Sequence, residues 1–449
     1  MFPYLPHTQE EIAAMLRSLG HPDLESLFSD IPDDLKLKGP LKLPDGQAEY
    51  DVLREGRRMA ESNLSGAVSF MGCGSYDHVI PQTVKHLLSR SEFYTAYTPY
   101  QAEIAQGMLQ SIFEFQTMVC ELTGLDVSNA SLYDGSTAAV EAAVMAVNSS
   151  PNNGDTILCS ATMHPFTREV LHSHFANTQV KLLEVGEKDG VVDRDDLLRK
   201  LGPGVAGVIC QNPNWYGCVE DYEGLADIIH EKEALFIVSS NPLSLGLLKS
   251  QGEWGADIGI GDTQPLGLPQ SFGGPSVGYI GAREKLLRKM PGRIVGQSID
   301  VDGKRAFLLT LQAREQHIKR QRATSNICSN QALFALASSI YLATVGKEGL
   351  REVCAINMEN ARYLRNLLTA IPKVRVCHEK PFFNEFALEL PMDAEKVCAK
   401  ALERGILAGV PLCRVDARAD RNKLLVAVTE KRTAAEMELF AKVLREVVR

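Results

Sequence analysis

Two short clusters of polar residues have the types and spacing to bind an anion or a phosphorylated cofactor. The first is Asp134-Gly135-Ser136-Thr137, directly before a segment rich in alanine and valine. A helix that begins here presents free backbone N–H groups, the hydroxyls of Ser136 and Thr137 and the positive end of the helix dipole. The same residues also make an ordinary helix cap, so the cluster by itself fits both interpretations.

The second cluster begins at Arg322 and precedes an apolar helix that we expect to start near Ile327. Three capping-type residues follow one another there: Thr324, Ser325 and Asn326. They exceed what one helix start needs and Arg322 adds a cation, so an anion site and a plain helix start remain equally open. The 314–322 stretch is basic, which indicates a solvated face or a docking surface for an acidic partner.

Other candidates are aromatic or lie in glycine-rich loops. Tyr97, Tyr100 and Gln101 lie at the expected start of a helix, where the tyrosines either pack or offer hydroxyls to a ligand. His164 follows an expected strand, where a structural histidine is the ordinary outcome. The 262–265 and 272–275 segments predict a tight loop whose glycines allow close backbone approach.

Alternating helices and short apolar runs must position these residues. Thr8 to Glu11 has the capping-box spacing for a helix near residue 9, and a further helix is expected at 47–62. A long helix is expected after Thr98-Pro99, ending at Gly124, and another after Asp134. Strands are expected at 156–159, 181–185, 205–210, 234–239, 257–260 and 277–280. This alternation predicts a mostly parallel sheet covered by helices on both faces.

From about residue 330 the pattern changes to two long helical segments, followed by strands near 374–377, 386–390 and 424–428 with helices at 393–404 and 432–449. We therefore predict three parts: an N-terminal helical arm at 1–65, a large α/β domain at 66–330 and a smaller α+β domain at 331–449.

Composition excludes several classes of protein. The 449 residues are 45% hydrophobic and 23% charged, as in folded globular proteins, and the net charge of −9 disfavours nucleic-acid binding. The longest apolar stretch, 332–345, is too short to span a membrane. The ten scattered cysteines predict reduced thiols and no metal site. The N-terminus lacks the pattern of a signal peptide, so we expect a cytoplasmic protein without a membrane partner.

Three stretches carry a family resemblance: YTPYQAEIAQGMLQSIFEFQTMVCELTG (97–124), GDTQPLGLPQSFGGPSVGYI (261–280) and REQHIKRQRATSNICSNQAL (314–333). They resemble the P-protein family of the glycine cleavage system, glycine dehydrogenase (decarboxylating), and within it the alpha subunit, or subunit 1, of organisms that split the enzyme in two. The resemblance extends over nearly the whole chain, from FPYLPHT onward.

The resemblance implies the aspartate-aminotransferase-like fold (fold type I) of pyridoxal-phosphate enzymes, which uses a lysine to hold the cofactor and an aspartate on its pyridine nitrogen. This sequence has Gln264 at or near the lysine position and Ser239 where the aspartate is expected. The resemblance thus implies a vestigial pocket formed by Ser136, Thr137, His164, Ser239 and Gln264. It also implies that this chain alone contributes no catalytic residue.

In this family the beta subunit holds pyridoxal 5'-phosphate covalently, so the resemblance implies an αβ or α2β2 complex. The complex decarboxylates glycine and transfers the aminomethyl group to the lipoyl arm of H-protein. Fold type I sites lie at subunit interfaces, so the implied shared site comprises Tyr97, Tyr100, Gln101, Arg322, Thr324, Ser325 and Asn326. The 314–322 stretch is a candidate docking surface for H-protein. Two alternatives stay open: a self-sufficient pyridoxal-phosphate enzyme that uses another lysine, and a non-catalytic scaffold for the beta subunit.

Overall fold

The computed structural model describes residues 4–96 and 98–449. The chain divides into two compact units, Met1–Ser65 and Gly66–Arg449. In the first unit, α1 (Gln9–Leu19) begins at the predicted capping box: Thr8 Oγ1 accepts from Glu11 N at 3.2 Å, and Glu11 Oε2 accepts from Thr8 N at 2.7 Å. A short helical turn (Glu25–Phe28) and α2 (Glu49–Glu61) follow.

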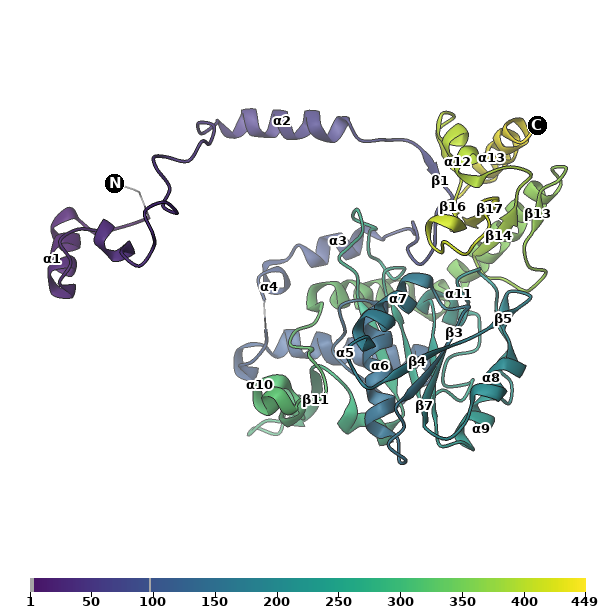
Figure 1. Ribbon diagram of the computed structural model, residues 1–449, viewed down its shortest axis with the longest axis horizontal. Coiled ribbons are helices and arrows are strands. Elements are labelled where there is room, and N and C mark those ends of the chain that lie inside the picture. The colour runs from purple at the N-terminus through teal and green to yellow at the C-terminus, as the bar shows by residue number, and fades with distance from the viewer. Residues whose placement is uncertain (1–3, 97) are drawn as a thin grey trace. The chain divides into compact units, whose positions relative to one another are not determined.

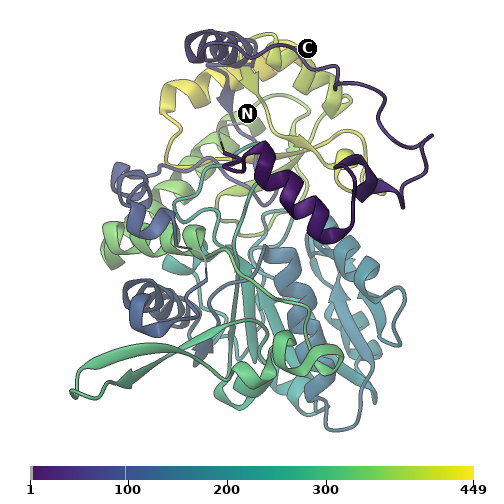
Figure 2. The same cartoon turned by 90° about the vertical axis from the view of Figure 1, so that its left-hand side faces the viewer.

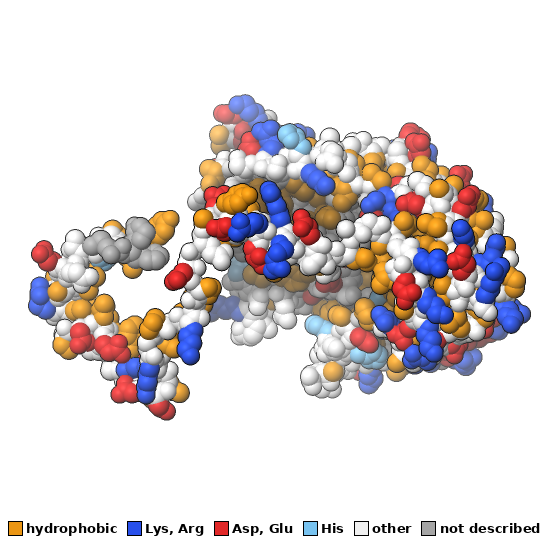
Figure 3. All heavy atoms as spheres, turned by 90° about the horizontal axis from the view of Figure 1, so that it is seen from above, with side chains coloured by type: hydrophobic (Ala, Val, Ile, Leu, Met, Phe, Trp, Pro, Cys, Tyr) orange, Lys and Arg blue, Asp and Glu red, His pale blue; other side chains and the backbone are white. Residues whose placement is uncertain are grey.

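Apolar side chains of this first unit are mostly exposed, as the orange side chains at the left of Figure 3 show. Among its described residues only Leu16 is buried, whereas Leu19, Leu35 and Tyr50 are 65%, 73% and 72% exposed. A segment of this kind has little core of its own to stabilise it.

The second unit is built on a seven-stranded sheet in the order β2-β10-β9-β8-β7-β3-β4. Figure 1 labels β3, β4 and β7 of this sheet. Its strands are β2 (Val127–Ser128), β3 (Thr156–Ser160), β4 (Lys181–Val185), β7 (Val205–Gln211), β8 (Leu235–Ser239), β9 (Ile258–Asp262) and β10 (Gly278–Ala282). Strands β4, β3, β7, β8 and β9 are parallel to one another, and β10 pairs antiparallel with both β9 and β2. The predicted mostly parallel sheet is confirmed.

Buried strands of this sheet send alternate side chains into two separate cores. Ile157 and Ile209 pack with α6 (Gly135–Ser149) and α7 (Pro165–Phe175), whereas Leu158 and Val208 pack on the opposite face. That second face is covered by α8 (Arg194–Lys200) and α9 (Leu225–His230). Because side chains alternate across a strand, a continuous apolar run is what a sheet covered on both faces requires.

The long helix α5 (Gln106–Thr123) ends, as predicted, at Gly124, which has a φ of 67°. Its predicted start after Thr98-Pro99 is wrong. The side chain of Gln106 bonds Ala102 O, Phe307 O and Phe307 N, which anchors the first helical residue to a neighbouring strand. Ile104 lies before the helix and is 82% exposed.

The C-terminal part contains a four-stranded sheet in the order β13-β14-β17-β16. Its elements are α11 (Ala332–Thr369), β13 (Arg375–Val376), β14 (Glu385–Glu389), α12 (Ala394–Leu402), β16 (Val410–Pro411), β17 (Lys423–Ala427) and α13 (Ala434–Val447). Gly346, with a φ of 63°, divides α11 into the two helical segments that the sequence predicts. A parallel bridge joins β1 (Val68–Ser69) to β15 (Ile406–Leu407).

Smaller elements complete the described structure. They are α3 (Gln82–Leu88), α4 (Ser91–Tyr94), β5 (Glu187–Lys188), β6 (Val191–Val192) and α10 (Gln316–Lys319). The sequence did not predict the hairpin of β11 (Ile294–Ile299) and β12 (Arg305–Thr310), which extends from the body in Figure 2. Across the described ranges, no helix combines the length and apolar character that crossing a bilayer demands.

A buried ion pair connects α7 and β4 to the C-terminal part. Arg168, with a side chain 8% exposed, contacts Glu184 and donates to Asp416 Oδ2 at 2.9 Å.

We expect Asp416→Asn to lower the free energy of unfolding by about 1–3 kcal/mol, since it weakens the pairing of a buried cation. Denaturant unfolding measures this. Asp420→Asn is the control, because that 69% exposed side chain pairs at the surface with Lys423 and should change stability by under about 0.5 kcal/mol. Equal losses in both variants would contradict the assignment.

Candidate functional site

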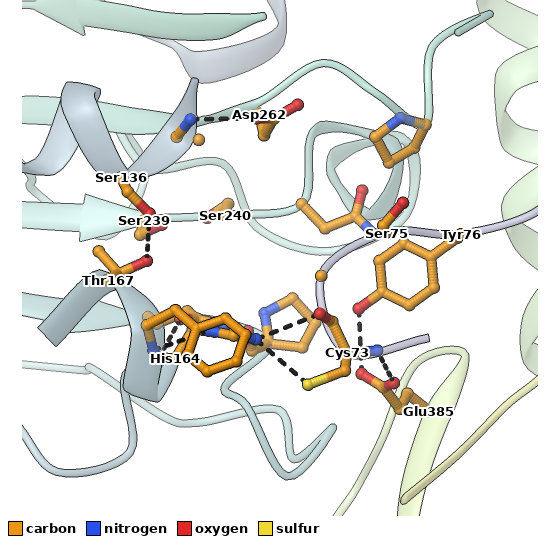
Figure 4. A pocket seen from close by; sticks show the side chains of 18 of the residues that line it. Cys73, Ser75, Tyr76, Ser136, His164, Thr167, Ser239, Ser240, Asp262 and Glu385 are labelled. Atoms are coloured by element: carbon orange, nitrogen blue, oxygen red, sulfur yellow. Dashed lines mark hydrogen bonds between the residues drawn. The ribbon is translucent and has the colours of Figure 1, made fainter. Parts of the chain in front are cut away.

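A cavity of about 390 Å³ lies where β7, β8 and β9 end and α6 and α7 begin (Figure 4). Gln211, Ser239 and Asp262 end these three strands and line it. Open parallel sheets bind ligands at the carboxyl ends of their strands, so the topology itself identifies this cavity as the candidate site.

At the start of α6, carboxylates occupy the hydrogen-bonding groups that an anion would use. Asp134 caps the helix by accepting from Thr137 N at 2.7 Å, and Asp262 Oδ2 accepts from Gly135 N at 3.0 Å. Figure 4 shows Asp262 directed at the end of the helix. Burial raises the pKa of Asp262, while hydrogen bonds from Ser276, Gln264 N and Gly135 N favour its ionised form. The predicted helix cap is confirmed, and two of its N–H groups, those of Gly135 and Thr137, are bound by the protein's own acids.

Ser136 faces the cavity and shares a 3.0 Å hydrogen bond with Thr167, as Figure 4 shows. Thr137 uses its backbone N–H for the cap and is not among the described residues that line the cavity.

Gln264 does not reach the cavity, because its amide is fully engaged elsewhere. Its Oε1 accepts from Tyr76 N, and its Nε2 donates to Tyr76 O and Leu268 O, each at 2.9 Å. The side chain is 5% exposed. Gln264 therefore serves to hold the Tyr76 segment along one wall.

His164 lines the cavity and caps α7 with its ring. Nδ1 accepts from Phe166 N at 3.2 Å, so the proton is on Nε2, which donates to Cys73 O at 3.1 Å. Burial lowers the pKa of His164 to about 4, so the ring is neutral at physiological pH. Cys73 Sγ lies 3.2 Å from Nε2, but burial raises the pKa of the thiol. The pair is therefore not an activated nucleophile.

Glu385, on β14, is a wall residue that sequence reasoning missed (Figure 4). Its Oε1 accepts from Cys73 N and its Oε2 accepts from the Tyr76 hydroxyl at 3.0 Å. Burial raises the pKa of Glu385 to about 7. No local pattern signals it, since more than 300 residues separate it from its partners.

The groups around the cavity do not fit a lysine-bound pyridoxal phosphate. None of the described lining residues is a lysine or an arginine. Beside the pocket, the amide of Gln264 cannot form an imine, and Ser239 has no charge to hold a pyridine nitrogen protonated. In addition, Asp262 occupies the end of the helix at which a phosphate would bind.

Arg293 connects Tyr100 to the residues that follow the 322–326 segment. It is 4% exposed, stacks over the Tyr100 ring at 5.5 Å and donates to Cys328 O at 2.9 Å and to Asn330 Oδ1 at 3.3 Å. Tyr100 and Gln101 line a separate surface hollow, whose described lining does not include the 322–326 segment. Tyr97 lies outside the described residues.

The expected helix start near Ile327 is wrong, because α11 begins at Ala332. Ile327 N binds Ser325 Oγ at 3.0 Å and Gln331 N binds Ser131 Oγ at 3.0 Å, so side chains take the place of helical hydrogen bonds. The 322–326 segment is thus not a helix terminus. Arg322, Thr324 and Asn326 are nevertheless exposed.

In the basic stretch, Arg314 is half-buried and donates to Met290 O and to Gly292 O. Its charge therefore serves to bind backbone carbonyls of the neighbouring loop, while Arg320 and Arg322 remain exposed.

Comparison with known proteins gives consistent matches. The family model of the glycine cleavage system P-protein matches residues 3–444. Proteins named probable glycine dehydrogenase (decarboxylating) subunit 1 from Bacillus cereus (strain ATCC 10987 / NRS 248) and Bacillus thuringiensis (strain Al Hakam) are 48% identical, over 97% of this chain and 97% of theirs. A crystal structure of glycine decarboxylase (P-protein) of the glycine cleavage system, in inhibitor-bound form, is 43% identical with a TM-score of 0.89, over 99% of both chains.

A sphingosine-1-phosphate lyase from Burkholderia pseudomallei K96243 matches with a TM-score of 0.66 at 17% identity, over 93% of this chain and 94% of the lyase. At this identity the likeness shows the fold alone, and it agrees with the predicted fold type I architecture.

Glu385 makes the stability of the fold depend on pH. Because its pKa is raised from about 4.5 to about 7, the folded chain binds this proton more tightly than the unfolded chain between those values. The free energy of unfolding should therefore fall as the pH rises from 4.5 to 7, by about 3 kcal/mol at most from this group. Measured by denaturant unfolding at several pH values, Glu385→Gln should reduce the fall in the free energy of unfolding between pH 4.5 and 7. Glu389→Gln, an exposed change on the same strand, should leave the wild-type slope; an unchanged slope in Glu385→Gln would contradict the assignment.

Proposed function

The chain belongs to the glycine cleavage system P-protein family, and we propose that it is one subunit of a two-subunit glycine dehydrogenase (decarboxylating) that is active only with its partner. Relatives that match 97% of this chain, over 97% of their own, are named subunit 1, which implies a second subunit. The substrate would be glycine, with lipoylated H-protein accepting the aminomethyl group.

One observation carries the proposal: among the described residues that line the cavity, no side chain could hold pyridoxal phosphate covalently. Gln264 uses its amide to bind Tyr76 and Leu268, and no described lysine lines the cavity. We therefore assign the lysine to the partner, in agreement with the beta subunit that the family resemblance implies. Bound there, pyridoxal phosphate would act as the electron sink for decarboxylation.

This chain would complete the partner's site with its own exposed polar groups. Tyr100 and Gln101 line a surface hollow, and Arg293 contacts Tyr100, Cys328 and Asn330. Thr324, Asn326 and Arg322 offer exposed hydroxyl, amide and guanidinium groups on the next segment. Such groups suit the phosphate and the polar edge of a cofactor that the partner holds.

The exposed cations of the basic stretch, among them Arg320, form a candidate surface for H-protein. They stand out against a net charge of −9. Cationic patches attract acidic partners and speed their encounter, so binding through this surface would weaken with salt.

Exchange of labelled bicarbonate into glycine, in the presence of H-protein, tests the division of labour. We expect no exchange with this chain alone, no exchange with the partner alone, and exchange when both are mixed. Gln264→Lys should not make the isolated chain active, because Asp262 still occupies the end of α6. Exchange by the wild-type chain without its partner would overturn the proposal.

Direct participation, as opposed to scaffolding, is tested at the 324–325 positions. The double substitution Thr324→Ala and Ser325→Ala should weaken retention of pyridoxal phosphate by the complex roughly tenfold or more, since it removes two hydroxyls. Dialysis followed by cofactor quantification measures this, and sedimentation confirms that the complex stays assembled.

The matched control is Gln321→Ala, an exposed neighbour outside the proposed contacts. It should retain the cofactor as the wild type does. If the double variant also retains the cofactor fully, then these hydroxyls do not contact it and the chain acts at this segment only as a scaffold.

A further inference from the structure

The segments that line the cavity also carry large apolar side chains that are exposed to solvent. They are Met71, Tyr133, Phe166 and Phe272, which are 40%, 36%, 51% and 100% exposed. Phe166 itself lines the cavity, and the other three lie one or two positions along the chain from residues that line it. We call these four side chains the apolar rim. Exposed apolar groups that gather around one opening indicate an interaction surface.

Phe272 belongs to a loop whose backbone conformation is strained. Its φ is 58°, in the left-handed region that bulky residues rarely adopt. The loop is nevertheless tied in place, because Gln270 O accepts from Gly273 N at 3.0 Å and Gln270 Nε2 donates to Ser75 O at 3.1 Å. Strain of this kind is typical of functional contacts, and a fully exposed ring does not stabilise the free chain. The loop therefore indicates a contact with another molecule.

The cavity behind the apolar rim is acidic. Asp134, Asp262 and Glu385 line it, the described lining has no lysine or arginine, and burial keeps the ring of His164 neutral. The three carboxyl groups accept hydrogen bonds from backbone N–H groups and hydroxyls, and none of them forms an ion pair with a described cation. Carboxylates removed from bulk water are ordinarily paired, so a cation from another molecule would be stabilised here.

This charge argues against a second copy of the chain as the molecule that covers the rim. In a symmetric pair the same surface meets itself, so carboxyl groups would face carboxyl groups between two chains of net charge −9. A small amine would pair with the carboxyl groups but leave the rim exposed. A protein segment with apolar side chains and a basic residue matches both features.

We propose that the apolar rim and the acidic cavity behind it form a docking surface for the partner subunit. Phe272 is its anchor, and a basic side chain of the partner faces the three carboxyl groups. This inference rests on the two-subunit enzyme proposed above, which supplies the partner. The residues involved are not those of the surface hollow at Tyr100, so the docking surface is a further contact region of the complex.

Phe272→Ala tests the anchor. Because the side chain is fully exposed, the change should leave the Tm of the free chain as it is, while it weakens association with the partner about tenfold or more. Calorimetric titration measures the affinity. The matched control is Leu198→Ala, an exposed change on α8, which covers the opposite face of the sheet from α6. Wild-type affinity in Phe272→Ala, or equal losses in both variants, would overturn the proposal.

Asp134→Asn tests the charge without removing the helix cap, since asparagine caps a helix as well as aspartate does. It should weaken association about threefold or more, because the partner's cation loses a counter-charge. Asp193→Asn is the matched control: Asp193 caps α8 in the same way, through Asp195 N and Asp196 N, and is not among the described lining residues. The control should bind as the wild type does. Wild-type affinity in Asp134→Asn would contradict the basic partner segment.

Phe272→Trp separates failure of this inference from failure of the proposed function. The chain has two tryptophans, and the added indole should fluoresce as a water-exposed group that shifts to shorter wavelength when the partner is added. A shifted probe in the free chain would mean that this chain covers the residue itself, which would overturn the docking surface. Bicarbonate exchange that needs both chains, together with a probe that does not shift, would overturn the docking surface alone. Exchange without the partner would overturn the proposed function and this inference with it.

Discussion

The hydrogen bond from the backbone N–H of Gly135 to the carboxylate of Asp262 places an acidic group at the start of α6, inside the candidate site. The start of a long helix at the carboxyl end of a parallel sheet is a ready site for an anion. Here a strand residue of the same chain supplies the negative charge, and Asp134 supplies a second. The helix is thereby stabilised without a ligand, and the place that a phosphate would need is already filled. The fold is that of pyridoxal-phosphate enzymes, and we propose that the partner subunit holds the cofactor.

Another wall of the same cavity is formed by the 73–76 segment, which contacts distant parts of the chain. Gln264 binds the backbone of Tyr76 from the large sheet, and Glu385 binds Tyr76 and Cys73 from the small one. The 73–76 segment thus joins the two sheets through buried polar groups, which are costly to leave unsatisfied. Gln264 therefore stabilises the fold through these hydrogen bonds, although its amide cannot form an imine with a cofactor as a lysine would.

Much of the fold was predictable because its signals are local. A few neighbouring residues are enough to predict some elements. Examples are the strand at 205–210, the capping box at Thr8 and the helix end at Gly124, and each was confirmed. The starts of α5 and α11 were not predicted correctly, because Gln106 and Ser131 decide them through bonds to segments about 200 residues away. For the same reason Glu385 escaped notice. Ser136, His164 and Ser239 do meet at one cavity, whereas Gln264 turns away from it. The contact of Asp262 with the helix start could have been predicted. Asp262 lies two residues before Gln264, and a carboxylate is attracted to the positive end of the helix that begins after Asp134.

We propose that this chain helps to form a cofactor site without holding the cofactor itself. Borohydride reduction of the assembled complex, loaded with pyridoxal phosphate and digested for peptide mapping, tests it most directly, because reduction fixes the cofactor on the lysine that binds it. We expect one pyridoxyl group for each pair of subunits, all of it on a lysine of the partner subunit. A pyridoxyl group on any lysine of this chain at comparable yield would contradict the account.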